Sequence, residues 1–414
     1  MLRRRDVLLA AGAGAAVGAL AGALGSDSPG FQSWEAVRAQ FRLDPSRVHL
    51  SNLFIATHPR PVREAIARHA EALDRDPAGY LLRTNTRALL EVYAEAARHF
   101  DAPEEHVALT RSTTEGLALL YNGLKLEPGD RVLVEEGGYY STWQSLGFKT
   151  AEGEGEVDRV SLFDDPAAVG TGEIVERLLR AVRPTTRAVA LTWVHSDTGV
   201  KLPIAEISKA LKAAARERGR PLLLCVDGVH GFGVEDTSLK ALGCDAFAAG
   251  CHKWLYGPRG TGVLYAADEG LWDELVPTVP PFGLRRTPGQ VMTPGGFHPF
   301  EHRWALADAF RFHRSVGQAR ITARIRELTG RLKEGLAELK GVTVLTPRSA
   351  ELSAGIVSFE LEGLSSSRVV SALGERGFVL TQSPYGREAV RAAPGYINTP
   401  EEIDRLLRAV RGLT

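Results

Sequence analysis

The apolar and polar positions in the middle of the chain alternate in the way expected of strands and helices. Five short apolar runs have the length of buried strands, at residues 131–136, 188–194, 222–227, 246–251 and 262–266. Unbroken apolar runs are typical of parallel strands that are covered on both faces. Amphipathic stretches such as 174–182 and 204–218 lie between them. We therefore expect an α/β fold, with a doubly wound, mainly parallel sheet and helices on both faces.

The C-terminal part has the pattern of a smaller α/β domain. A helical spacing of apolar residues over 300–328 predicts one long linking helix. Two strands and a last helix should follow, near residues 342–345, 356–361 and 400–411. The division that we predict is a large domain over 45–299, then the linking helix and the small domain over 300–414.

The first 25 residues have the pattern of an export signal. Three arginines stand before an uncharged run rich in alanine and glycine, and Ala21-Gly22-Ala23 offers a cleavage site. The Arg4-Arg5 pair with the residues after it resembles a twin-arginine motif. We expect export by the twin-arginine machinery to the periplasm or the extracellular space. The alternatives are a cytoplasmic protein with a basic tail, and a membrane anchor that is not cleaved.

Composition narrows the class of protein. The chain has 414 residues, with 50 basic and 50 acidic side chains and 44% hydrophobic residues. A balanced charge gives no field that would favour nucleic acid or an anionic membrane, and this hydrophobic content suits a globular enzyme. The three cysteines, Cys225, Cys244 and Cys251, form no CxxC pair and have no metal-ligand spacing. We expect no metal site.

Two residues at strand ends carry the clearest chemical signal. The run 222–227 ends on Asp227, and the run 246–251 is followed by His252, Lys253 and a glycine-rich turn. Ligands of such sheets bind at the carboxyl ends of the strands. A lysine amine can form a Schiff base with an aldehyde, and a carboxylate can keep a pyridine nitrogen protonated. Pyridoxal 5'-phosphate (PLP) needs both groups.

The sequence around this pair resembles a known family. Residues 225–266 read CVDGVHGFGVEDTSLKALGCDAFAAGCHKWLYGPRGTGVLYA. They resemble the lysine region of class V, fold-type I PLP enzymes, and most of all the isopenicillin N epimerase-like branch, where Gly-x-Cys-His-Lys-Trp is familiar. Cys251 stands where a smaller or hydroxylated residue is commoner. The resemblance extends over nearly all of residues 45–412 and implies the PLP-dependent transferase fold of type I.

Hydroxyl side chains stand before a predicted helix at 117–124. The stretch 110–116 reads Thr-Arg-Ser-Thr-Thr-Glu-Gly, and a helix start of this kind either binds a phosphate dianion or serves as an ordinary cap. It resembles the family's Asn-Ala-Thr-Thr/Glu stretch, with Ser112 in place of asparagine or glycine. The resemblance implies that Thr113 and Thr114 bind the phosphate.

The resemblance implies further cofactor contacts. Tyr139 would stack on the ring, His230 would contact the phenolic oxygen, Ser196 would lie near that oxygen or the substrate, and His252 would lie beside Lys253. Thr293, in Thr-Pro-Gly-Gly, resembles the segment that reaches the phosphate of the neighbouring subunit, which implies a homodimer with shared active sites.

Arg391 is the candidate for binding a substrate carboxylate. A guanidinium can bind a carboxylate through two hydrogen bonds. Residues 386–399 resemble the closing motif of the family, Arg-x-Ser-x-x-x-Tyr-Asn-Thr, with Ala393 in place of the serine. The resemblance implies an amino acid or amine substrate. If Arg391 were a surface residue, Arg285 or Arg286 would be the next candidates.

The reaction is less specified than the cofactor, since one fold of PLP enzymes supports several reactions. Our leading hypothesis is removal of the Cα proton by Lys253 in an epimerase or racemase. The alternatives are a Cβ–S lyase and an aminotransferase. A cysteine desulfurase is disfavoured, because it needs a cysteine on a C-terminal loop and none follows Cys251. A binding protein without activity is the alternative of another class, and the joint presence of Lys253, Asp227 and Arg391 argues against it.

Overall fold

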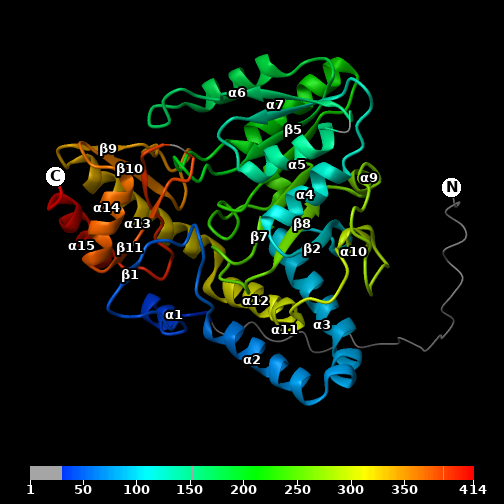
Figure 1. Cartoon of the computed structure of the whole chain (residues 1–414), viewed down its shortest axis with the longest axis horizontal. Helices are drawn as coiled ribbons and strands as arrows, with labels where there is room; N and C mark the ends of the chain where they lie inside the picture. Colours follow the sequence, from blue (N-terminus) through cyan, green and yellow to red (C-terminus); the bar gives the residue numbers. More distant parts are fainter. Residues whose placement is uncertain (1–29, 152, 386) are drawn as a thin grey trace, which may run out of the picture.

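A computed structural model describes residues 30–151, 153–385 and 387–414. A large domain surrounds an extended sheet, and a small domain of orange and red elements stands beside it (Figure 1). The export signal predicted for residues 1–25 lies outside the described residues. Within the described ranges, no helix is both long and apolar enough to cross a membrane.

The large domain is built on a seven-stranded sheet with the order β2-β8-β7-β6-β5-β3-β4. The strands are β2 (Val107–Thr110), β3 (Arg131–Glu135), β4 (Glu156–Val160), β5 (Thr186–Thr192), β6 (Leu223–Asp227), β7 (Ala246–Gly250) and β8 (Gly262–Ala266). The predicted strand positions are confirmed to within two residues. The parallel direction predicted for 262–266 is wrong, because β8 runs antiparallel to both β7 and β2. The link 251–261 contains no helix, whereas a parallel return needs a crossover, usually a helix.

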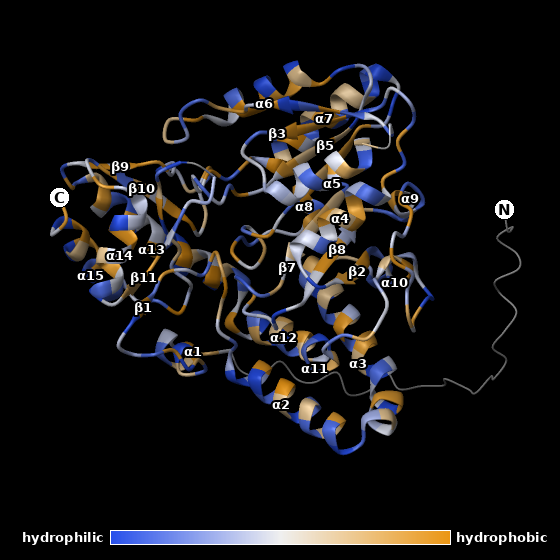
Figure 2. Cartoon of the chain, viewed as in Figure 1, coloured by the Kyte–Doolittle hydropathy of each residue, from blue (hydrophilic) through white to orange (hydrophobic). Residues whose placement is uncertain are grey.

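Alternate side chains of the strands enter two different cores. Leu133 and Val189 belong to one hydrophobic cluster, whereas their neighbours Val132 and Ala188 belong to another. The first face is covered by α3 (Pro77–Phe100), α6 (Thr171–Ala181), α7 (Ile204–Arg218) and α12 (Leu306–Val316). The second face is covered by α4 (Thr113–Gly123), α5 (Tyr140–Ala151), α9 (Glu269–Asp273) and α10 (Pro288–Met292). Figure 2 shows strands of the sheet in orange, while helices such as α2 (Arg60–Arg75) carry both colours. Helices on both faces confirm the predicted doubly wound arrangement.

The prediction of one long helix over 300–328 is wrong in one respect, because three consecutive helices occupy this region. Helix α11 (Phe300–Trp304), α12 and α13 (Gln318–Ala337) follow one another. Between the last two stands Gly317, whose φ of +95° lies in the left-handed region that favours glycine. The helical spacing continues across this break, so the pattern alone did not reveal it.

The small domain combines sequence from both ends of the chain. Its antiparallel sheet has the order β12-β13-β10-β9, from Thr381–Gln382, Val390–Ala392, Val357–Leu361 and Val342–Val344. Its helices are α13, α14 (Ser366–Glu375) and α15 (Pro400–Arg411). Strand β1 (Val48–His49) pairs in parallel with β11 (Phe378–Val379), so blue and orange segments lie side by side in Figure 1. The remaining helices are α1 (Trp34–Arg38) and α8 (Leu239–Leu242).

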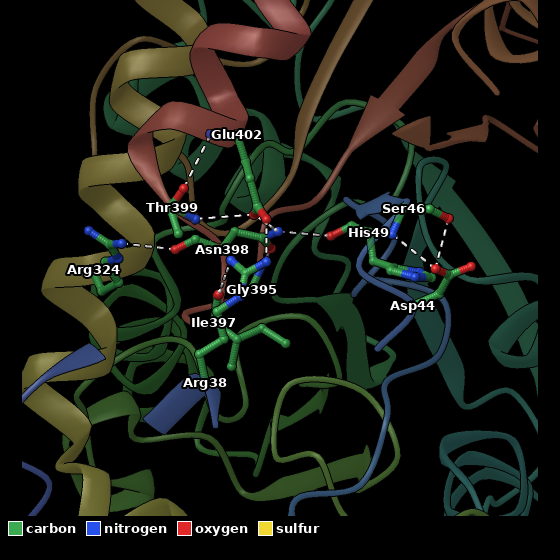
Figure 3. Close-up of polar contacts among 10 residues, drawn as sticks. All are labelled: Arg38, Asp44, Ser46, His49, Arg324, Gly395, Ile397, Asn398, Thr399 and Glu402. Carbon is green, nitrogen blue, oxygen red and sulfur yellow. Dashed lines mark hydrogen bonds and ion pairs between the residues drawn. The ribbon is translucent and has the colours of Figure 1, made fainter. Parts of the chain in front are cut away.

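A polar network fastens the N-terminal segment to the start of α15 (Figure 3). The buried Asn398 side chain donates from Nδ2 to the His49 carbonyl (3.1 Å) and to Glu402 Oε2 (2.8 Å). Its Oδ1 accepts from the Gly395 backbone N–H at 2.9 Å. Arg38 of α1 forms an ion pair with the same Glu402. The stretch after β13, the strand that carries Arg391, is thereby held against residues near the other end of the chain.

Candidate active site

A cavity of about 910 Å³ opens at the carboxyl ends of β5, β6 and β7. All of the predicted site residues except Thr293 line this cavity, namely Thr113, Thr114, Tyr139, Ser196, Asp227, His230, His252, Lys253 and Arg391. The structure thus brings together residues from the large domain and, through Arg391 on β13, from the small domain. Arg285 and Arg286, the alternative arginines, are not among the lining residues.

Lys253 follows β7 and presents its amine to this cavity. Burial lowers the pKa of Lys253 to about 8, although the nearby Asp227 carboxylate acts in the opposite direction. Its Nζ lies 3.5 Å from His230 Nε2. Trp254 Nε1 donates to the other ring nitrogen, Nδ1, at 3.3 Å, which assigns the proton of the neutral ring to Nε2. Burial also holds the pKa of His230 well below its usual value. Lys253 is therefore an amine that loses its proton near neutral pH, as a nucleophile for an aldehyde requires.

Asp227 ends β6 with one oxygen in use and one without a partner. Oδ1 accepts from the Val229 backbone N–H at 3.1 Å, whereas the buried Oδ2 has no hydrogen-bond partner among the described residues. Burial raises the pKa of Asp227 to about 6. A buried carboxylate oxygen without a donor is costly. The protonated nitrogen of a pyridine ring would satisfy it, so the residues present fit PLP.

The N-terminus of α4 supplies the polar end of the cavity. The helix begins at Thr113, four residues before the predicted start, because Ser112 caps it by accepting from the Glu115 N–H at 3.1 Å. Thr113 Oγ1 accepts from the Gly250 N–H at 2.8 Å, which ties the helix to the end of β7. Thr114 Oγ1 lies 3.2 Å from the Tyr139 hydroxyl. The first-turn N–H groups and the positive end of the helix dipole favour a phosphate here.

Arg391 crosses from the small domain to the loop after β5. Its Nη1 donates to the Ser196 carbonyl at 3.0 Å and its Nε donates to Thr381 Oγ1 at 3.1 Å. Within the described part of the chain, Nη2 makes no hydrogen bond. Burial lowers the pKa of Arg391, and an arginine remains charged under such conditions. The guanidinium is thus fixed at the cavity wall with one terminal nitrogen available to a carboxylate.

Thr293 lies elsewhere. Its hydroxyl lies 2.7 Å from the Tyr93 hydroxyl, accepts from the Leu109 N–H at 3.0 Å and donates to the Gly289 carbonyl at 3.0 Å. These contacts occupy the hydroxyl within its own chain, so the structure does not bring the Thr293 side chain to this cavity. A contact between its segment and the cofactor of a partner subunit stays a prediction.

The buried His195 supports the loop that leads to Tyr139. Its Nε2 lies 2.9 Å from Glu135 Oε2, and both side chains are buried. Burial alone would lower the pKa of His195, but the Glu135 carboxylate outweighs this and raises it. A Cβ on Gly137 would come within 2.8 Å of the His195 ring. The pair therefore forms a floor under the loop that leads to Tyr139.

Several lining residues were missed in the sequence. They come from the N-terminal segment, from the start of α5, from β12 and from the loop after β12, and include Leu53, Phe54, Tyr140, Thr381, Gln382, Pro384 and Tyr385. Tyr385 accepts a hydrogen bond from Ser196 Oγ at 3.2 Å. No local pattern distinguishes these side chains from ordinary loop residues, since only the folded chain brings them to the cavity.

Comparisons with known proteins agree with this geometry. Residues 79–406 match the family described as Aminotransferase class-V. The isopenicillin N epimerase of Streptomyces clavuligerus is 30% identical over 404 residues, which cover 92% of this chain and 98% of that protein. A protein of Xylella fastidiosa named "probable cysteine desulfurase" is 28% identical over 423 residues, with coverages of 92% and 96%. The cysteine desulfurase structure of Thermococcus onnurineus NA1 superposes with a TM-score of 0.78 at 23% identity, with coverages of 92% and 97%, and shows the same fold.

The family match spans most of the chain, and the relatives align over nearly their whole length. The cavity supplies a lysine, an unpartnered carboxylate oxygen and a helix N-terminus for the cofactor. The chain therefore belongs to the class-V aminotransferase family and is a PLP-dependent enzyme of fold type I.

Proposed function

We propose that this enzyme inverts the configuration at Cα of an α-amino acid, as an epimerase or racemase. One observation carries the proposal: Lys253, with a lowered pKa, shares a cavity with Arg391, whose Nη2 is available. An amino acid that places its carboxylate at Arg391 can turn its Cα toward the lysine amine. The similarity to the isopenicillin N epimerase of Streptomyces clavuligerus over nearly the whole chain supports the same reaction class.

Each residue of the cavity has a separate task in this reaction. Arg391 binds the carboxylate and fixes the orientation of Cα. The neutral amine of Lys253 accepts the Cα proton on its own face, and inversion is complete when a proton is delivered to the opposite face of the same carbon. Asp227 would hold the ring nitrogen of PLP through its unpartnered Oδ2 and, as an anion, would favour the protonated form of that nitrogen. PLP, when bound, supplies an electron-withdrawing ring that makes the Cα–H bond acidic.

A Cβ–S lyase is the second candidate, because a relative named "probable cysteine desulfurase" is 28% identical over 92% of the chain. A lyase that passes sulfur to its own cysteine is disfavoured here. Burial raises the pKa of both Cys244 and Cys251 to about 12, and the remaining cysteine, Cys225, is buried as well. A thiol of this kind is a poor sulfur acceptor, since the thiolate is the nucleophile. An aminotransferase remains a further alternative.

The products of single amino acids in D₂O separate these reactions. An epimerase gives the opposite enantiomer with deuterium at Cα, a lyase gives a keto acid with a released sulfur species, and an aminotransferase gives a keto acid only with an amino acceptor. Lys253→Ala is the control and should abolish exchange at Cα. Absence of deuterium from Cα with every amino acid of a broad panel would refute the proposal, and absence of a keto acid as well would favour a binding protein.

We further propose that the protein is a homodimer exported by the twin-arginine route. The exposed Phe282 and Phe297, whose rings are 5.7 Å apart, lie on either side of Thr293 in the sequence and offer an apolar surface to a second subunit. Light scattering of the purified protein tests the dimer, and a monomeric mass would refute it.

Fractionation of cells that carry Arg4→Lys and Arg5→Lys tests the proposed export route, and an unchanged location of the protein would refute export by this machinery.

A further inference from the structure

The outer part of the cavity has a chemical character of its own. We propose that the substrate carries a bulky, uncharged side chain, and that Phe54, Tyr140 and Tyr385 select it. The inference rests on the proposed amino-acid substrate and names the class of its side chain. These three residues are called the rim below.

Each charged side chain that lines the cavity already has a partner group on the cofactor or on the substrate backbone. The charged lining side chains are Asp227, Lys253 and Arg391, which serve the ring nitrogen, the amine and the carboxylate. The lining histidines are kept neutral by burial, which holds the pKa of His230 well below its usual value and lowers that of His252 to about 4. A charged substrate side chain would thus find no partner of opposite charge on this wall, whereas an apolar one gains contacts with the rim.

The positions of the assigned groups direct the side chain toward the rim. Cα has four substituents, of which the carboxylate goes to Arg391 while the amine and the hydrogen face the cofactor and Lys253. Tyr385 lies beside the carboxylate position, because Ser196 contacts both Tyr385, through its hydroxyl at 3.2 Å, and Arg391, through its carbonyl at 3.0 Å. The remaining substituent therefore points to the uncommitted part of the wall, to which the rim contributes the aromatic side chains.

Phe54 is held in place relative to the reacting centre. Its backbone N–H donates to the Ser51 carbonyl at 2.9 Å, and two residues later the Ala56 N–H donates to the His252 carbonyl at 3.0 Å. His252 directly precedes Lys253, so the backbone around Phe54 is fastened next to the catalytic lysine. The Phe54 side chain is nevertheless 65% exposed. Large apolar side chains exposed at the mouth of a cavity are typical of ligand-binding grooves.

The cavity has room for a substrate as well as the cofactor. Its volume of about 910 Å³, which PLP and the substrate share, stands near the upper end of the range of about 300–1,000 Å³ for small-molecule sites. The rim comes from three separate parts of the chain: the segment after β1, the start of α5 and the loop after β12. A bulky group would therefore meet side chains from more than one segment.

Phe54→Ala in the PLP-loaded enzyme tests the inference. The wild type should turn over phenylalanine and leucine better than alanine, glutamate or lysine. The variant should lose roughly tenfold or more in kcat/KM for phenylalanine, as single contacts in apolar pockets change selectivity by about 10–200-fold, and should keep its rate with alanine. The matched control is Phe148→Ala on α5, where the side chain is 67% exposed and does not line the cavity. This control should leave both rates unchanged.

Binding of α-methyl amino acids provides a readout that does not depend on the proposed reaction. These compounds lack the Cα hydrogen, so a titration of the cofactor absorbance reports binding alone. The wild type should bind α-methylphenylalanine more tightly than α-methylalanine, and this difference in affinity should disappear in Phe54→Ala. If Cα exchange fails while this difference holds, the proposed epimerisation is wrong and the selectivity stands.

Four results would overturn the inference. One is an equal loss for alanine and phenylalanine in Phe54→Ala. The second is no loss at all in this variant. The third is a wild-type preference for a charged side chain. The fourth is a change of oligomeric state in Phe54→Ala, which would assign the residue to a subunit interface. As a positive test, Phe54→Lys should move the preference toward glutamate, because it places a cation on the rim.

Discussion

Replacement of Arg391 by leucine should remove the preference of the enzyme for substrates with a carboxylate. In the structure the guanidinium is buried and is fixed by two hydrogen bonds, to Ser196 and Thr381. Truncation of one partner of a buried charge pair costs roughly 2–5 kcal/mol. At about 1.4 kcal/mol per tenfold change, kcat/KM for an amino acid should fall by about thirty- to several-thousand-fold. The turnover rate should fall together with affinity, because the carboxylate also orients Cα toward the lysine.

The assay compares phenylalanine with phenylethylamine, which has the same side chain and no carboxylate. The wild type should prefer the amino acid, and Arg391→Leu should treat the two compounds alike. The absorbance of the cofactor should be retained, since Arg391 stands apart from the helix and the strands that hold it. Arg387→Leu is the control, because this arginine is exposed and lies four residues earlier on the same segment. If Arg391→Leu keeps the wild-type ratio between the two compounds, Arg391 does not bind the carboxylate.

Four further predictions concern charge, proton transfer and stability. Burial raises the pKa of Asp227 from 3.8 to about 6, so its stabilising contribution is complete below pH 3.8 and is lost as the pH rises through 6. Between pH 4 and pH 8 the free energy of unfolding of cofactor-free Asp227→Asn should therefore rise by up to about 3 kcal/mol relative to that of the wild type. Melting temperatures of both proteins across this range test it, and parallel curves of melting temperature against pH would contradict it. The same variant with PLP should lose turnover, because asparagine does not hold the ring nitrogen protonated. Lys253 has a pKa of about 8, and only its neutral amine attacks an aldehyde. The rate of PLP uptake by the cofactor-free protein should therefore rise with pH up to about pH 8 and then become constant. A rate that continues to rise to pH 10 would count against this pKa. Asn398→Ala removes three side-chain hydrogen bonds and should lower the free energy of unfolding by about 3 kcal/mol, at about 1 kcal/mol each. Urea titration measures this change, and Arg331→Ala, which breaks an exposed ion pair, is the control with little expected change. An equal effect of the two substitutions would be inconsistent with the role of Asn398.

The parts of the fold and site that the sequence revealed depend on local patterns. Buried strands appear as short apolar runs, and polar residues that follow such runs meet at one edge of a parallel sheet. For this reason Asp227 and Lys253 could be paired before the structure was known. The pattern records burial and not direction, so it did not show that β8 is antiparallel. It also did not show the break at Gly317, because the apolar spacing of a helix is kept on both sides of it.

The rest of the site depends on contacts between distant parts of the chain. Phe54 and Tyr385 are 331 positions apart in the sequence and line the same cavity. Trp254 donates to His230 and sets the proton position on a ring that faces Lys253, a relation that neither residue indicates alone. Asn398 and Thr399 end the closing motif of residues 386–399, and only the structure shows that their side chains join α15 to the N-terminal segment and cap that helix.

The joining of the two chain ends constrains how the protein is made. Strand β1 pairs with β11, and Asn398 bonds to the His49 carbonyl across 349 positions. A ribosome releases the chain from the N-terminus, so residues 48–52, whose backbone partners lie within 377–393, must wait until nearly all of the protein has been synthesised. Contacts of such separation slow folding, because a long loop must be closed before they form. The segment that carries Phe54 is among the first to be synthesised and among the last to find its place, so completion of the cavity becomes a late event in the life of each new molecule.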